Sequence, residues 1–181
     1  MADGGKDVHI GDHQQRVANL ACVIADEMGL AQTRVCGIRI AALVHDVGKL
    51  WLRSEVLNKP TELTEIEFGI IRAHAEAGYR TCMAMGFPLP VAQMVLQHHE
   101  RMDGSGYPQG LSGEDIVLGA RILAVADVIG AMTSERPYRP AHSVDEALEQ
   151  VVQNRGTLYD PEVVDACLQL SDEGRLRTVL Q

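Results

Sequence analysis

The chain carries two short clusters of histidine and acidic residues, each set in apolar sequence. They are His45-Asp46-Val47-Gly48-Lys49 and Gln97-His98-His99-Glu100. Imidazole nitrogens and carboxylate oxygens are ligands that divalent transition metals bind well in proteins. Two adjacent residues on a helix point about 100° apart, so the members of each doublet can address different ions of a close pair. Because two-metal sites serve in-line displacement at phosphorus, the clusters predict a binuclear phosphohydrolase.

A further carboxylate and two histidines lie where apolar residues would be expected. Asp127 follows the apolar run 123–126, and a lone carboxylate buried there would be costly without a partner. His13 opens an amphipathic segment, and His74 lies within another. A pair of cations would provide the partner that Asp127 needs. Asp46 is the best candidate to bridge two ions, because a carboxylate has two oxygens to share and an imidazole has one free nitrogen.

The composition is that of one globular domain. Of 181 residues, 46% are hydrophobic, 23% charged and only 4% aromatic, a mixture that favours packed helices over a β-sandwich. The net charge of −9 argues against a duplex nucleic-acid partner, which needs a basic footprint. The four cysteines form no C-x-x-C pair, and no secretory leader or apolar run of about 18 residues occurs. We therefore expect a cytoplasmic protein with free thiols that does not enter membranes.

Hydrophobic spacing of three and four residues predicts helices throughout the chain. Thr64 with Glu67, and Ser143 with Glu146, have the spacing of capping boxes at helix starts. The expected helices cover residues 12–29, 35–47, 64–80, 88–99 and 117–132, one that begins at 143, and a last one over 160–170; a glycine-rich loop is expected over 101–114. Residues 1–7 are expected to be a disordered linker or an expression remnant, and residues 8–181 a single all-α phosphohydrolase domain.

Four motifs follow one another along the chain. They are HDVGK at 45–49, HHER at 98–101, DGSGYP at 103–108 and SERPYR at 134–139. Together they resemble the HD-GYP family, a subgroup of the HD superfamily of metal-dependent phosphohydrolases, from about His13 to Cys167. The resemblance implies a compact multi-helix bundle around a binuclear metal site that hydrolyses cyclic di-GMP to linear pGpG, and in some cases to GMP. The metal ligands it implies are His13, His45, Asp46, His74, His98, His99 and Asp127.

Other residues are expected to act on the substrate. Lys49 would direct its ammonium group toward the reacting phosphate and so share the catalytic role with Asp46. The resemblance implies that Tyr107 of the glycine-rich loop binds the dinucleotide, together with Arg136 and Arg139, whose planar guanidinium groups suit phosphate or guanine. The expected nucleophile is a hydroxide that bridges the two ions.

A third metal ion is not expected. Some family members carry a glutamate four residues before the position of His13 and an aspartate three residues after that of Asp127, where this chain has His9 and Gly130. Of these two positions, only His9 has a side chain that could bind a third metal ion. Glu100 is expected to orient a ligand histidine rather than to bind metal itself.

Iron or manganese is the expected metal, with zinc, cobalt and nickel as alternatives. Two rival functions fit the same residues. One is hydrolysis of another substrate, such as a mixed cyclic GMP-AMP dinucleotide or a nucleotide monophosphate. The other is a regulatory module that senses the dinucleotide without useful catalysis. An upstream sensor or receiver domain, a diguanylate cyclase partner and a homodimer are all compatible with the sequence.

Overall fold

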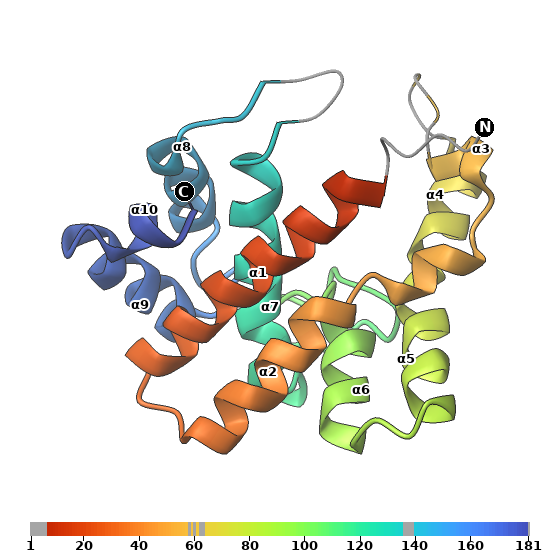
Figure 1. The fold of residues 1–181 in the computed structure, drawn as a ribbon, viewed down its shortest axis with the longest axis horizontal. Coiled ribbons are helices and arrows are strands. Elements are labelled where there is room, and N and C mark those ends of the chain that lie inside the picture. Colours follow the sequence, from red (N-terminus) through yellow and green to blue (C-terminus); the bar gives the residue numbers. More distant parts are fainter. Residues whose placement is uncertain (1–6, 58, 60, 62–63, 136–139, 181) are drawn as a thin grey trace.

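The computed structural model describes residues 7–57, 59, 61, 64–135 and 140–180, except the side chains of 7–11, 54 and 57, and shows an all-α fold as the sequence predicts (Figure 1). The elements are α1 (Asp7–Glu27), α2 (Gln32–Val44), the 3₁₀ helix η1 (Val47–Trp51), α3 (Ser54–Leu57), α4 (Glu65–Arg72), α5 (His74–Ala84), α6 (Leu89–Gln97), the 3₁₀ helix η2 (Gly113–Asp115), α7 (Leu118–Met132), α8 (Val144–Gln153), α9 (Pro161–Asp172) and α10 (Arg175–Leu180). Arg136 and Arg139 lie outside the described residues.

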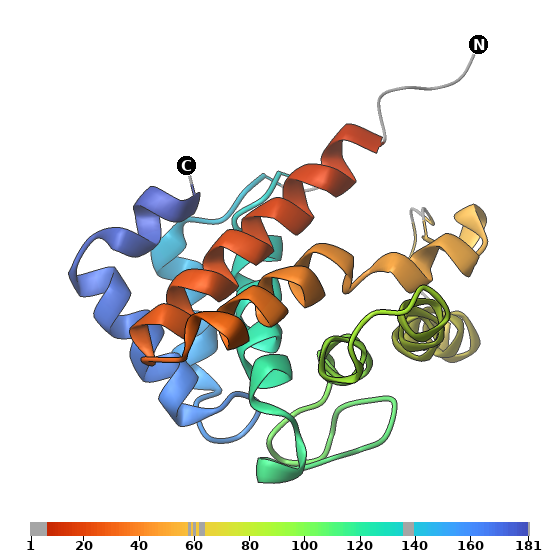
Figure 2. The ribbon, with the colours of Figure 1, turned by 60° about the horizontal axis from the view of Figure 1, so that its bottom comes forward.

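The core is organised around α7, whose residues are buried on most sides. Helix α1 packs against both α2 and α7, and the two views in Figures 1 and 2 show α1 lying across them. The buried residues of α1 recur at spacings of three and four, which is the pattern that buries one helical stripe. They are Val17, Ala18, Leu20, Ala21, Ile24 and Ala25. Helices α5 and α6 pack together beside η1 and α2, so the chain segments that bear the two histidine clusters are brought side by side.

The helix expected to run from Thr64 is divided in two. Its capping box with Glu67 is present, but α4 ends at Arg72 and α5 begins at His74. The imidazole of His74 donates from Nδ1 to the carbonyl of Ile71 at 2.6 Å, and in a continuous helix that carbonyl would accept an amide N–H four residues on. The interruption therefore involves the same side chain that the sequence marks as a metal ligand.

Several other boundaries differ from those expected. Helix α2 spans Gln32–Val44 rather than 35–47, so His45 follows the helix instead of lying within it, and α5 runs to Ala84 rather than to 80. The four-residue helix α3 was not expected. Helix α1 begins at Asp7, ahead of the expected start at Asp12. Helix α10 was not expected at all; it follows Gly174, which has a φ of 71°, and it buries Leu176 and Leu180. Hydrophobic spacing does not reveal the first residues of α1, because they are too polar. It does not reveal α10 either, because a six-residue helix repeats its buried position only once.

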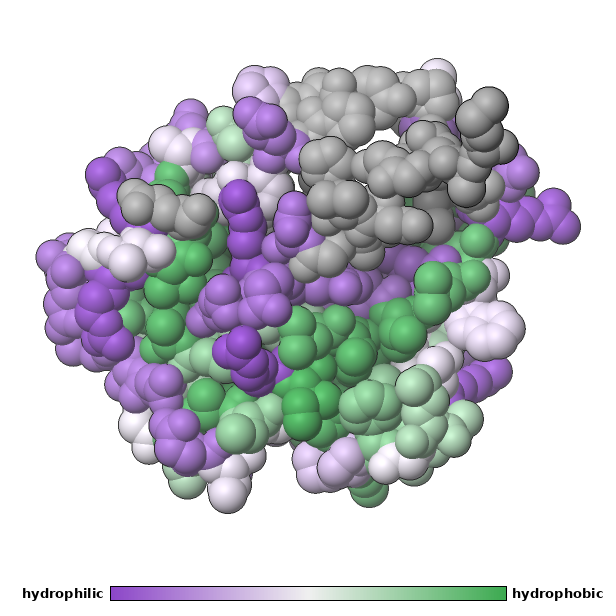
Figure 3. All heavy atoms as spheres, in the orientation of Figure 1, coloured by the Kyte–Doolittle hydropathy of each residue, from purple (hydrophilic) through white to green (hydrophobic). Residues whose placement is uncertain are grey.

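Apolar side chains reach the surface beside the second half of α2. Figure 3 shows them gathered in a band over α2 and η1, where Ile40, Leu50 and Trp51 are exposed. The ring N–H of Trp51 donates to Thr81 Oγ1 at 3.1 Å, which ties η1 to α5. None of the helices described is long and apolar enough to span a lipid bilayer.

Candidate metal centre

Three of the predicted ligand histidines lie at helix ends and are oriented in the same way. His45 follows α2, His98 follows α6, and His74 follows the end of α4. Each donates from Nδ1 to the carbonyl three residues earlier: His45 to Ala42 (2.7 Å), His74 to Ile71 (2.6 Å) and His98 to Val95 (2.6 Å). Carbonyls in the last turn of a helix lack amide partners, so they accept these bonds readily. A carbonyl can only accept, so Nδ1 carries the proton and Nε2 keeps its lone pair for a metal.

The predicted ligands form two groups of three. His13, His45 and Asp127 make the first triad, and His74, His98 and His99 make the second; within each, the ligand atoms lie within 4.8 Å of one another. Asp127 Oδ1 is 3.1 Å from His13 Nε2 and 3.7 Å from His45 Nε2. In the second triad, the Nε2 atoms of His74 and His98 are 3.3 Å apart. Each triad could hold one metal ion.

Asp46 lies between the two triads. Its Oδ2 is 3.5 Å from His45 Nε2, and its Oδ1 is 3.7 Å from His74 Nε2. Each carboxylate oxygen therefore faces a different triad, which is the geometry that a bridging ligand requires. Lys49, in η1, donates from Nζ to the same Oδ2 at 2.7 Å, so its ammonium group lies directly beside the position predicted for the bridge.

The lone pairs of this centre need a cation. His45 Nε2 is buried and has no hydrogen-bond partner among the described residues, and a buried acceptor without a partner is costly. The Nε2 atoms of His74 and His98 both carry lone pairs and face each other at 3.3 Å, an arrangement that is repulsive unless a positive charge is shared between them. All three side chains are almost completely buried. The residues present therefore fit a divalent transition-metal pair.

The protonation states also suit metal binding, which requires neutral imidazoles and ionised carboxylates. Burial, reinforced by the charges of His45 and His74, lowers the pKa of His98 to about 3. Burial likewise lowers the pKa of His74 and of His99. Burial alone would raise the pKa of Asp46, but the charges of His45 and Lys49 outweigh it, and the pKa falls to about 2.

Asp127 shows the same balance at the other side of the centre. Burial raises its pKa, and the hydrogen bond from His13 together with the charges of His45 and His99 lowers it further than burial raises it. The carboxylate is therefore ionised at neutral pH, as expected for a buried acid that binds a cation.

Tyr107 lies against the second triad. Its ring stacks on that of His99, with centroids 4.7 Å apart and an interplanar angle of 28°. Burial raises the pKa of Tyr107 to about 12, so the phenol stays protonated at neutral pH. Gly106 precedes it where a Cβ would collide with the backbone of His99 and Glu100, so only glycine lets the loop approach this closely.

Glu100 has different partners from those expected. Its buried carboxylate accepts hydrogen bonds from the backbone N–H groups of Gln109 (2.7 Å) and Leu111 (3.0 Å). These bonds close the glycine-rich loop that carries Tyr107. The side chain therefore positions the loop, rather than a ligand histidine as the sequence suggested.

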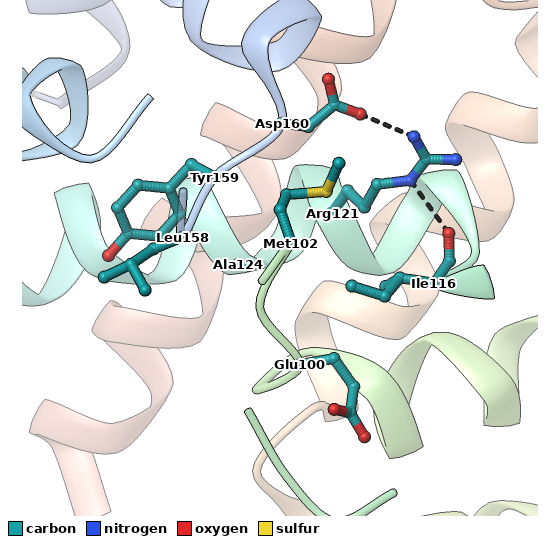
Figure 4. Close-up of a pocket in the computed structure, with 8 residues that line it drawn as sticks. All are labelled: Glu100, Met102, Ile116, Arg121, Ala124, Leu158, Tyr159 and Asp160. Atoms are coloured by element: carbon teal, nitrogen blue, oxygen red, sulfur yellow. Dashed lines mark hydrogen bonds and ion pairs between the residues drawn. The ribbon is translucent and has the colours of Figure 1, made fainter. Parts of the chain in front are cut away.

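Behind this loop, a buried ion pair joins α7 to the start of α9 (Figure 4). Arg121 Nη1 donates to Asp160 Oδ2 at 2.8 Å, and Arg121 Nε donates to the carbonyl of Ile116 at 2.9 Å. Asp160 also caps α9 by accepting from Glu162 N. The carboxylate of Glu100 points away from this pair in Figure 4. The pair thus fixes α7, which bears Asp127, to α9, which carries none of the predicted ligands.

Three of the other predicted site residues have side chains outside the described part of the chain. The side chain of His9 is outside the described residues, as are Arg136 and Arg139. Gly130 lies beside the first triad, because a Cβ built there would be 3.8 Å from His13 Cε1 and 3.0 Å from Val17 Cγ2. An acidic residue at this position would face His13, and this chain has none there.

Sequence reasoning missed Arg72. Its guanidinium carbon lies 4.4 Å from the ring centre of Phe68 and 5.3 Å from that of Tyr107. The available signal was an arginine two residues before His74 and four residues after Phe68. Residues four apart are neighbours on the surface of a helix. That signal is weak, because it occurs on many solvent-facing helices.

The chain is similar to known proteins over most of its length. A family model described as the HD domain matches residues 5–163. The chain is 43% identical over 169 residues to the cyclic di-GMP phosphodiesterase response regulator RpfG of Xanthomonas campestris pv. campestris, a match that covers 92% of this chain and 44% of that protein. It is 37% identical over 157 residues to the 3'3'-cGAMP-specific phosphodiesterase 3 of Vibrio cholerae, covering 87% of this chain and 34% of that protein.

Among solved structures, a cyclic GMP-AMP-specific phosphodiesterase of V. cholerae (V-cGAP3) superposes with a TM-score of 0.74 at 22% identity, over 93% of this chain and 46% of that chain. The chain belongs to the HD domain family of proteins. The resemblance to its HD-GYP branch that the motifs predict is confirmed. The chain spans less than half the length of the two curated relatives named above.

Proposed function

We propose that the chain is a metal-dependent phosphodiesterase that hydrolyses cyclic di-GMP to pGpG in bacterial second-messenger signalling, with GMP as the alternative end product. The observation that carries this proposal is the pair of ligand triads with Asp46 between them, one oxygen toward each. The relative at 43% identity is named a cyclic di-GMP phosphodiesterase, which supports this substrate. Two divalent ions held there would supply Lewis-acid activation of the attacking water and of the phosphodiester.

The chain's own residues would position and stabilise the reacting group. The Lys49 ammonium group donates to Asp46 Oδ2 and its side chain is 40% exposed, so it can also donate to a phosphoryl oxygen bound next to Asp46. Tyr107 covers His99 and closes that side of the centre. Arg136 and Arg139 are proposed to hold the dinucleotide away from the bond that breaks. His9 is not proposed as a ligand.

Iron or manganese is the proposed metal, because a site of imidazoles and carboxylates without thiolate suits both ions. Zinc, cobalt and nickel have the same ligand preferences and are alternatives. We also propose a cytoplasmic location, in keeping with four free cysteines. A sensor or receiver domain, a diguanylate cyclase partner and a homodimer are proposed partners, because the curated relatives named above are more than twice as long as their matched regions.

The test is hydrolysis of cyclic di-GMP by protein loaded separately with iron, manganese or zinc, with the products separated by chromatography. We expect pGpG to form first. The matched variant Asp46→Ala should show no turnover and should retain one metal ion or none, because both ions share this ligand. Full metal content and normal turnover in Asp46→Ala would refute the bridging role.

The mixed cyclic GMP-AMP dinucleotide is a second candidate substrate, because one relative at 37% identity is named for it. Initial rates with both dinucleotides and with nucleotide monophosphates, measured on one preparation, decide between them. A fully metal-loaded protein that binds cyclic di-GMP without turnover would instead indicate a sensing module.

A further inference from the structure

The guanidinium group of Arg72 lies beside the candidate metal centre, and its hydrogen-bond donors are available to a ligand. The residue lies in the last turn of α4 and is exposed, with its guanidinium group over the rings of Phe68 and Tyr107. An aromatic face attracts a guanidinium group but does not occupy its fork of five N–H donors. Among the residues that the structure describes, no carboxylate or carbonyl accepts a hydrogen bond from Arg72.

Tyr107 connects this cation to the second triad. Its ring stacks on His99 at 4.7 Å and meets the ring of His74 edge-on at 6.5 Å. Arg72 is therefore one aromatic ring away from two predicted metal ligands. A ligand that is held at the triads and extends past Tyr107 would therefore come within reach of Arg72.

A cyclic dinucleotide has such an extension. It contains two phosphodiester groups on opposite sides of its ring, and only one can occupy the metal centre while its bond is cleaved. The other remains anionic, in a protein whose net charge of −9 disfavours anions. A guanidinium fork matches two oxygens of one phosphate, and its attachment to aromatic rings orients it before the ligand arrives.

We propose that Arg72 binds the phosphate of the dinucleotide that is not being cleaved, and so selects substrates that have a second phosphate. This inference rests on the proposed function, because it assumes that a dinucleotide occupies the centre. Phe68 and Tyr107 hold the guanidinium group in place, and the metal centre acts on the other phosphate.

The test compares Arg72→Gln with wild type on two substrates. One is cyclic di-GMP, and the other is bis(p-nitrophenyl) phosphate, a diester with a single phosphate. For cyclic di-GMP we expect KM to rise about tenfold or more, the effect of losing a charged hydrogen bond, with kcat changed less than about twofold. For bis(p-nitrophenyl) phosphate, both constants should stay unchanged. Arg72→Lys should restore part of the affinity, because it keeps the charge without the fork.

A matched control is Arg34→Gln, which removes the same charge from an exposed residue near the start of α2, about 16 Å along the helix from His45. It should leave the KM for cyclic di-GMP unchanged. An unchanged KM in Arg72→Gln overturns the proposal. So does an equal loss of activity on both substrates, because that would show that Arg72 only supports Tyr107 and the centre.

The proposed function can fail separately. If wild type cleaves bis(p-nitrophenyl) phosphate but not cyclic di-GMP, the substrate assignment is wrong, while the role of Arg72 is still measured by the inhibition constant of pGpG against the small diester. That constant should rise about tenfold in Arg72→Gln if the residue binds a second phosphate. An unchanged inhibition constant overturns the inference in that case too.

Discussion

At the scale of single residues, the ends of helices prepare the ligands for metal. The last carbonyls of a helix have no amide partner, and His45, His74 and His98 each use one of them to fix the ring. The bond sets both the tautomer and the direction of the Nε2 lone pair. Because the bond spans only three residues, each ligand is oriented by its own segment of the chain rather than by contacts with other helices.

Lys49 should act on the chemical step rather than on binding. Its ammonium group is 2.7 Å from Asp46 Oδ2, so it lies where charge on the phosphoryl oxygens would develop. We expect Lys49→Ala to lower kcat by about one to two powers of ten, the loss of a charged hydrogen bond, with little change in KM. Metal content should be unchanged, because Lys49 is not a ligand. Wild-type kcat at full metal loading would show that this assignment is wrong.

Acid should destabilise the metal-free protein. The pKa of His98 is lowered to about 3 by burial and neighbouring histidines, whereas an unfolded histidine titrates near 6.5. Between these values the unfolded chain binds more protons, so stability falls as pH falls, by about 1.4 kcal/mol per pH unit for this group. Asp46, with its pKa lowered to about 2 from 3.8, adds a change of the same sign below about pH 4.

Urea unfolding with a chelator, between about pH 7 and pH 5, measures this slope. His98→Gln should reduce it. His142, which is half-buried and lies 3.6 Å from Glu146 outside the centre, provides the control: His142→Asn should leave the slope unchanged. Stability that does not vary over this range would contradict the prediction.

At the scale of elements, the sequence predicts helix starts well where a polar cap marks them. The capping boxes at Thr64 and Ser143 and the cap at Asp160 are all present, because each depends on residues within one turn. The break at Ala73 was not predictable in the same way. It coincides with a ring-to-carbonyl bond of His74, which hydrophobic spacing does not report.

In the candidate site too, the features that depend on nearby residues could be predicted from the sequence, and those that depend on distant residues could not. The two adjacent doublets at His45 and His98 could be recognised as a metal motif from the sequence, because their chemistry is visible in single residues. The loop role of Glu100 could not, since its partners are backbone amides nine and eleven residues later. Their position depends on the path of the loop, which no local pattern of side chains specifies.

The ion pair between Arg121 and Asp160 should be a main support of the fold. Side-chain exposure is 18% and 4% for the two partners, so Asp160→Asn would leave a largely buried cation unpaired. Asparagine still caps a helix, so the loss reports the pair rather than the cap. We expect the free energy of unfolding to fall by about 3–5 kcal/mol. Chemical denaturation of the metal-free protein is the measurement.

A surface ion pair that also involves α9, through Asp165, provides the comparison. Arg155 and Asp165 are bonded through two contacts, but their side chains are 42% and 54% exposed. Asp165→Asn should cost less than about 1 kcal/mol, because exposed pairs contribute little. If both variants were equally stable, the buried pair would not be the support that its position indicates.

At the scale of the whole molecule, the candidate centre joins segments that are far apart in the sequence. The first triad draws on α1, the end of α2 and α7, and the second on α5 and the end of α6. Asp46 lies between them, just after α2. Metal ions bound there would act as cross-links between five helices, so metal binding and folding stability should be coupled.

Metal-replete protein should therefore contain two ions per chain and should be stabilised by both. The described residues contain two ligand triads, and position 130, beside His13, is a glycine that offers no further carboxylate for a third ion. When free metal is about 100-fold above its dissociation constant, each ion should add about 2.7 kcal/mol to the free energy of unfolding, and a chelator should remove it. Elemental analysis gives the stoichiometry and denaturation the stability. His74→Ala, which disrupts only the second triad, should lose about one ion and half of the stabilisation. Three ions per chain in wild type, or stability that is insensitive to the chelator, would contradict a two-metal centre that joins the helices.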